Sequence, residues 1–213
     1  MLPARSFLVL LPVLLFAAPA SAQPPEEPID WYVVDVRGSL VPFPRNVELA
    51  DARGLRPPDT PGTGRGFDIA AHVYPLRVWI VTFGIGASYH VSAASQAPGE
   101  FSPMPDGPPV RKEFSALSPQ LSFNFGTRDG WSYLSGGIGR SRLSLYTEGS
   151  GAPEQPTANT LNYGGGVRWF TSDHLAFTID ARFYAISPIA EMGDRPRSPR
   201  MTQMTLNVGV SFR

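Results

Sequence analysis

The sequence predicts an all-β fold: an eight-stranded antiparallel up-and-down transmembrane β-barrel, preceded by a cleaved signal peptide. Three observations lead to this fold. Apolar and polar residues alternate in eight short segments, the connections between these segments are long and short in turn, and no apolar run after residue 22 approaches the length of a membrane-spanning helix. Alternation with a period of two places the apolar side chains on one face of a strand, and membrane-spanning barrels are built from such strands.

The N-terminus has the layout of a secretory signal peptide. Arg5 supplies a positive charge, an apolar run follows and ends near Ala18, and the sequence ASA at Ala20–Ala22 provides a small-residue cleavage site. The apolar run is shorter than the ~20 residues that a helical membrane anchor needs. We therefore expect a signal peptide (1–22), a short N-terminal periplasmic segment (23–29) and the barrel (30–213).

The composition excludes several classes of function. The chain has no cysteine, which rules out disulfide scaffolds, thiol catalysis and thiolate metal sites. Its 18 basic and 18 acidic residues give no basic excess for binding nucleic acid. Three scattered histidines do not predict a metal site, and the glycine run Gly164–Gly166 is not followed by a helix, as a phosphate-binding loop would be. We expect neither a metal nor a cofactor.

The alternating segments define the expected strands and their connections. The segments cover residues 30–41, 65–74, 78–91, 114–125, 131–145, 160–170, 175–185 and 202–213. Short turns are expected at 75–77, 126–130 and 171–174, and long Pro-rich or Gly-rich loops elsewhere. The fifth segment is the least regular: Trp131 and Tyr133 are expected on its outward face, although Leu134 and Ile138 fall on the opposite face.

Charged residues share the faces opposite the apolar ones. These charged residues are Asp35, Arg37, Asp68, Arg140, Arg168, Asp180 and Arg182. An arginine that faces lipid near the middle of the bilayer costs about 2–4 kcal/mol. Because an eight-stranded barrel is filled by its own side chains, we expect these groups to form a paired network that plugs the lumen.

Aromatic residues gather near the strand ends and indicate which face meets lipid. The expected girdle consists of Trp31, Trp79, Trp131 and Trp169 at the short-turn ends, with Tyr89 and Tyr163 toward the long-loop ends. Two aromatic tiers match the two interfaces of a bilayer. A soluble periplasmic lipocalin-like barrel that binds a ligand remains an alternative. Such a barrel would turn its apolar face inward and bury tryptophan in the middle of strands.

Three stretches resemble the small outer-membrane barrels of the OmpA-type eight-stranded superfamily. GGGVRWF (164–170), followed by DHLAFTIDARFY (173–184), resembles the hairpin before the last strand in that family. LNVGVSFR (206–213) is similar to the C-terminal signal of outer-membrane barrels, with Phe212 as its aromatic residue.

The resemblance implies an integral protein in the outer membrane of a Gram-negative-type bacterium. Its partners would be outer-membrane lipid and, during export, periplasmic chaperones and the barrel-assembly machinery, which would recognise the Phe212 signal. The implied role is structural or in surface interaction, without catalysis, and the sequence identifies no extracellular ligand.

His90 and Ser92 leave a second function open. Outer-membrane lipid A deacylases are eight-stranded and use a His-x-Ser pair with an acid, and the sequence HVS places such a pair at the end of the third segment. A nucleophilic serine needs an adjacent, oriented base, and no acid is clearly placed to orient this histidine. A lipid-modifying hydrolase is therefore retained as an alternative to the structural role.

Overall fold

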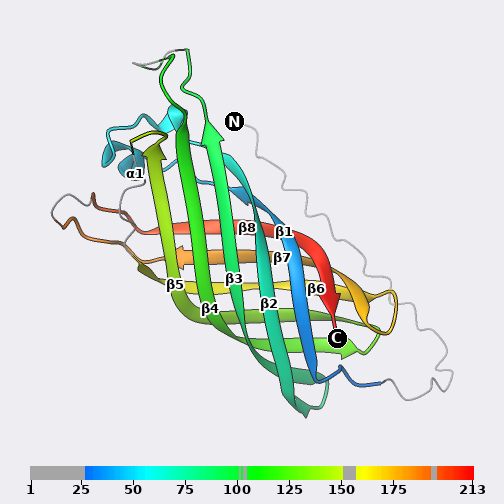
Figure 1. Cartoon of the computed structure of the whole chain (residues 1–213). Helices are drawn as coiled ribbons and strands as arrows, with labels where there is room; N and C mark the ends of the chain where they lie inside the picture. Colours follow the sequence, from blue (N-terminus) through cyan, green and yellow to red (C-terminus); the bar gives the residue numbers. More distant parts are fainter. Residues whose placement is uncertain (1–26, 101, 103–104, 151–156, 193–195) are drawn as a thin grey trace, which may run out of the picture.

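Eight strands close into one antiparallel barrel in the computed structural model, which describes residues 27–100, 102, 105–150, 157–192 and 196–213 (Figure 1). The strands are β1 (Tyr32–Pro42), β2 (Thr63–Val78), β3 (Val81–Gln96), β4 (Val110–Thr127), β5 (Gly130–Thr147), β6 (Ala158–Phe170), β7 (Leu175–Ile186) and β8 (Met201–Phe212). Each strand pairs with the next, and β8 also pairs with β1, so no strand edge is left open. The predicted fold class is confirmed. The expected signal peptide lies outside the described residues.

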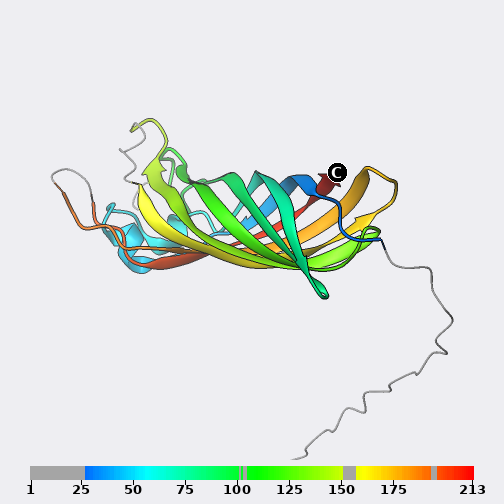
Figure 2. The same cartoon turned by 90° about the horizontal axis from the view of Figure 1, so that it is seen from below.

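The connections divide the barrel into two different ends. Figure 2 shows the long connections at one end and the short turns at the other. One turn differs from its expected place: β2 runs past Pro75, and the chain reverses at Trp79–Ile80, where Trp79 has a φ of 56°. Pro75 falls in a register shift between Val73 and Leu76, an irregularity that tolerates a residue without an N–H group.

The outer wall is largely apolar, and the middle of the lumen is charged. Leu121 and Val208 are each 60% exposed on the outside, whereas Asp35 and Asp180 are buried inside. A water-soluble barrel has the opposite arrangement, so this is the surface of a barrel that crosses a membrane. No helix within the described ranges has the length and hydropathy needed to cross a membrane.

The facing of β5 is the reverse of the expected one. Tyr133 is 3% exposed and points into the lumen, whereas Leu134 is 61% exposed on the outer wall. The neighbouring strand explains this choice, because a Cβ on Gly166 of β6 would lie 2.7 Å from the Tyr133 hydroxyl. The glycine thus leaves the room inside the barrel that the tyrosine fills, and Leu134 and Ile138 meet lipid instead.

The first long connection folds over the long-loop end of the lumen. It contains α1 (Val47–Asp51) and the short 3-10 helix η1 (Pro57–Asp59), neither of which the sequence indicated. The side chain of Asn46 caps α1 by accepting a hydrogen bond from the Leu49 N–H, at 2.8 Å. This turn points Leu49 down into the barrel.

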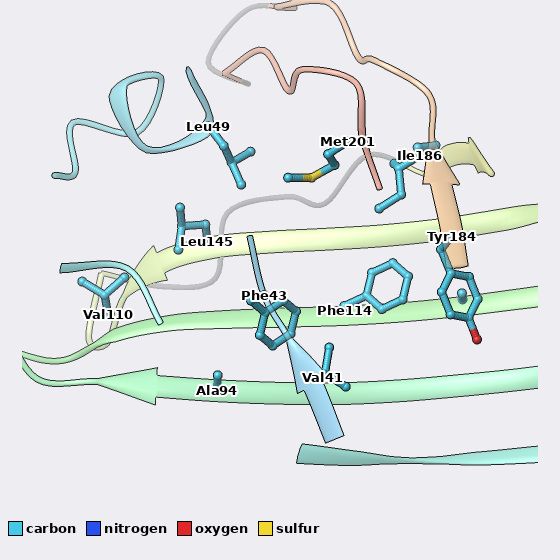
Figure 3. Close-up of a cluster of buried hydrophobic side chains, with 12 residues drawn as sticks. Val41, Phe43, Leu49, Ala94, Val110, Phe114, Leu145, Tyr184, Ile186 and Met201 are labelled. Carbon is cyan, nitrogen blue, oxygen red and sulfur yellow. The ribbon is translucent and has the colours of Figure 1, made fainter. Parts of the chain in front are cut away.

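A cluster of apolar side chains fills this end, and we call it the mouth cluster (Figure 3). Its members are Val41, Phe43, Leu49, Ala94, Val110, Phe114, Ala116, Leu145, Ala158, Tyr184, Ile186 and Met201. Two hydrogen bonds hold the connection in place: Lys112 Nζ donates to the Pro44 carbonyl at 2.8 Å, and Gln203 Nε2 donates to the Pro42 carbonyl at 2.9 Å. The mouth cluster is therefore shared between the barrel wall and an ordered loop.

We predict that Phe43→Ala destabilises the barrel by about 3 kcal/mol, because it removes a buried ring from the mouth cluster. Urea unfolding in lipid vesicles, followed by tryptophan fluorescence, measures this loss. Val47→Ala in the same connection is the control, since Val47 is exposed and should change stability by no more than about 0.5 kcal/mol. Equal effects of the two substitutions would show that the loop does not close the mouth.

Candidate functional site

Six charged side chains meet inside the barrel, and we call them the lumen network. They are Asp35 and Arg37 of β1, Asp68 of β2, Arg168 of β6, and Asp180 and Arg182 of β7. None of these side chains is more than 1% exposed, and three arginines balance three aspartates. The structure thus brings together six of the seven charged residues that the sequence placed in the lumen.

Arg37 lies at the centre of the lumen network and contacts all three aspartates. Its guanidinium lies 2.5 Å from Asp68, 3.4 Å from Asp180 and 3.9 Å from Asp35. The β1–β2 pairing explains the shortest contact, because Arg37 and Asp68 are directly opposite each other in the register. The correct pairing of β1 with β2 is therefore enough to place Arg37 beside Asp68.

Arg168 and Asp35 form a two-point ion pair. Arg168 Nε and Nη2 donate to the two Asp35 carboxylate oxygens at 2.9 and 2.7 Å. Ser211 of β8 adds a hydrogen bond to the same carboxylate at 2.5 Å. Such two-point, charge-assisted contacts are the strongest hydrogen bonds of a protein interior and the most demanding in geometry.

Four side chains contact the Asp180 carboxylate. Arg182 Nη2 donates to it at 2.9 Å, the Tyr133 hydroxyl at 2.8 Å and Asn207 Nδ2 at 2.9 Å, and Arg37 also faces it. Tyr133 links two members of the network, because its oxygen also accepts a hydrogen bond from Arg37 Nη1 at 2.9 Å. Sequence analysis missed Tyr133, although the apolar Leu134 and Ile138 on the opposite face were a signal of its inward facing.

Arg140, the seventh predicted lumen residue, is not in the lumen. Its prediction was wrong because it depended on the facing of β5. Arg140 is exposed on the outer wall, opposite the exposed Leu117 of β4.

Five of the six predicted girdle residues lie on the outside of the barrel. The structure places Trp31, Trp79, Trp169, Tyr89 and Tyr163 with their rings exposed on the outside. Trp131 is a wrong prediction, since it is 3% exposed and stacks on Phe170 with ring centroids 5.1 Å apart. With Ile29, Val33, Tyr74 and Tyr133 it forms a second apolar cluster, the base cluster, at the short-turn end of the lumen.

His90 and Ser92 contact each other but lie on the wrong side of the wall for lipid chemistry. His90 Nε2 is 3.1 Å from Ser92 Oγ, and both side chains are buried. Rings of Phe114 and Tyr184 flank the histidine, each with its centroid 5.7 Å away. The carboxylate opposite His90 in the register is that of Asp68, and it is paired with Arg37. The geometry therefore gives a lipid hydrolase no support.

The part of the chain that the structure describes contains no cluster of three potential metal ligands.

The closed barrel with an apolar wall and a paired polar lumen defines the class of this protein: an integral membrane β-barrel. No family model and no curated protein matches the sequence. Solved structures do match. Neisserial surface protein A aligns with 85% of this chain and 96% of its own, at 16% identity and a TM-score of 0.53.

Two further outer-membrane structures match less closely. Ail, the attachment invasion locus protein of Yersinia pestis, aligns with 85% of this chain and 95% of its own, at 16% identity and a TM-score of 0.44. The outer membrane protease OmpT of Escherichia coli aligns with 86% and 96%, at 10% identity and a TM-score of 0.42. At 16% identity, the comparison with Neisserial surface protein A shows a shared fold and nothing finer.

We predict that Asp180→Ala destabilises the barrel by about 3–5 kcal/mol, because it leaves buried guanidinium groups without their carboxylate. Urea unfolding in lipid vesicles is again the measurement. The control is Glu113→Ala, which breaks the 2.8 Å ion pair with Arg111 at the long-loop end; because both side chains are partly exposed, the loss should stay below about 1 kcal/mol. A similar loss in both variants would contradict the importance of the lumen network.

Proposed function

We propose that this chain is an integral protein of the outer membrane of a Gram-negative-type bacterium, and that it presents its long connections at the cell surface for interaction. The observation that carries the proposal is the filled lumen. The base cluster, the lumen network and the mouth cluster follow one another along the barrel. A barrel filled in this way supports its loops rigidly and offers no wide aqueous path.

Contacts that hold the long connections in place support a role for the loop surface. Arg53, after α1, donates to Ser198 Oγ at 3.0 Å, and Gln96 donates to the Pro58 carbonyl at 2.8 Å. A cleft of about 310 Å³ lies between the first two long connections, and its lining includes Arg53, Leu55 and Asp59. A concave surface with apolar area and both signs of charge is suited to binding a partner.

We also propose that this chain belongs to the OmpA-type eight-stranded superfamily. The motifs before and within β8 support membership of the OmpA-type superfamily, and the name of Neisserial surface protein A agrees with a surface location. Outer-membrane lipid would contact the apolar wall, and the periplasmic chaperones and barrel-assembly machinery would act during export.

Three measurements on the unmodified protein test this proposal together. We expect the protein in the outer-membrane fraction, a shift in gel mobility between unboiled and boiled samples, and no large stable openings in planar bilayer recordings. Openings on the nanosiemens scale would refute the filled lumen and indicate a porin. A periplasmic protein whose mobility does not change on boiling would refute the membrane barrel itself.

Phe212 allows a test of the assembly partners. Its side chain faces outward where β8 pairs with both Val34 of β1 and Leu175 of β7. We predict that Phe212→Asp prevents insertion and leaves the protein in the periplasm, since it removes both a lipid anchor and the aromatic residue of the proposed signal. Phe125→Asp is the control, because Phe125 is another outward ring at the short-turn end. An equal insertion defect in the control would show that the defect comes from placing a charge against lipid and not from the loss of a C-terminal signal.

A further inference from the structure

Arg140 stands on the outer wall, and no side chain in the described part of the structure forms an ion pair or hydrogen bond with its guanidinium. Its outward neighbours include the exposed apolar residues Ile138 on β5 and Leu117 on β4, and the exposed Arg142 two residues further along β5. Among the described residues, no carboxylate lies within ion-pair distance of its guanidinium. Its guanidinium is therefore available to a counter-charge from the membrane, and the cost of its outward position depends on its depth.

The depth of Arg140 follows from the strand register. Gly136 of β5 is paired with Tyr163, whose outward ring belongs to the part of the predicted girdle toward the long-loop ends. Arg140 lies four residues farther toward the long loops, which is ~13 Å along the strand. Tyrosine rings favour the interface, so Arg140 lies at or beyond the level of the lipid headgroups on the long-loop side.

A groove on the outer wall lies next to Arg140. Asn159 of β6, the cross-strand partner of Arg140, lines a groove of about 340 Å³. The outward side chains of Ile138, Leu161 and Ala185 give the groove an apolar part, and Asn159, Ser187 and Arg200 give it a polar part. None of the described residues that line the groove is acidic.

We propose that this groove binds a phosphate-bearing lipid of the surrounding membrane. An acyl chain would lie along Ile138, Leu161 and Ala185, and the phosphate would lie at the polar rim beside Arg140 and Arg200. Guanidinium groups suit phosphate in both charge and geometry. The inference rests on the proposed membrane location, since the apolar wall has to face acyl chains for the groove to be filled in this way.

A second groove on the outer wall provides the contrast. It lies across β2, β3 and β4, and its lining includes Arg65, Phe67 and Glu113. Here a carboxylate accompanies the arginine, and it disfavours a phosphate at the same rim. Arg65 therefore serves as a matched outward arginine, near the same end of the barrel, in a groove of mixed charge.

The test uses the full mature barrel in nanodiscs of phosphatidylcholine that contain a minor fraction of phosphatidylglycerol. Native mass spectrometry after release into detergent measures how many phosphatidylglycerol molecules stay bound. We expect the unmodified protein and Arg65→Gln to retain phosphatidylglycerol, and the double variant Arg140→Gln/Arg200→Gln to retain about a hundredfold less, as expected for the loss of one charged hydrogen bond from each arginine.

The outcomes separate the groove from the membrane barrel. Each sample is first checked for the heat-dependent gel shift of a folded barrel. If folded unmodified protein retains no phosphatidylglycerol, or if Arg65→Gln loses as much as the double variant, the lipid site is refuted and the barrel stands. If the unmodified protein enters nanodiscs without acquiring the gel shift, the membrane barrel is refuted, and the groove with it.

Discussion

The contact of one arginine with three aspartates is the constraint on which the rest of this structure depends. Arg37 is buried in a lumen walled by strands whose other face is apolar, so its charge has to be neutralised within the barrel. Its aspartates lie on β1, β2 and β7. A slip of one residue in any of these strands would turn a charged side chain to lipid and an apolar one inward. The lumen network thus selects one register for half of the barrel wall, independently of the turns.

The local alternation of the sequence predicts the number of strands and the faces of most of them, because in an extended chain facing is decided residue by residue. It fails for β5, where Tyr133 and Leu134 offer an apolar side chain to each face. That choice is made by Gly166 on the neighbouring strand, a contact that no window of β5 contains. The errors for Trp131 and Arg140 have the same origin, since both residues follow the facing of Tyr133.

The mouth cluster was beyond prediction for a different reason. Phe43 and Leu49 lie in a connection rich in proline and glycine, which the sequence indicates only as a loop. They become core residues because the barrel end offers Phe114, Leu145 and Tyr184 as partners. The result is a lumen with two chemistries, charged in its middle and apolar at its mouth. The loop is thereby anchored by burial, which explains how so irregular a segment can present a defined surface.

Strand β8 closes the barrel through its backbone and also contributes side-chain hydrogen bonds to the lumen network. Asn207 and Ser211 of β8 donate hydrogen bonds to Asp180 and Asp35, and Ser39 of β1 donates to Asn207 across the seam at 2.6 Å. Opening the barrel between β1 and β8 would therefore break backbone pairs, the hydrogen bond from Ser211 to Asp35, and the contact between Arg37 of β1 and Asp180 of β7. These losses disfavour a half-open barrel in lipid, where no water replaces the broken hydrogen bonds. These contacts hold β1 and β8 together, and they disfavour the passage of a molecule from the lumen into the bilayer between the two strands.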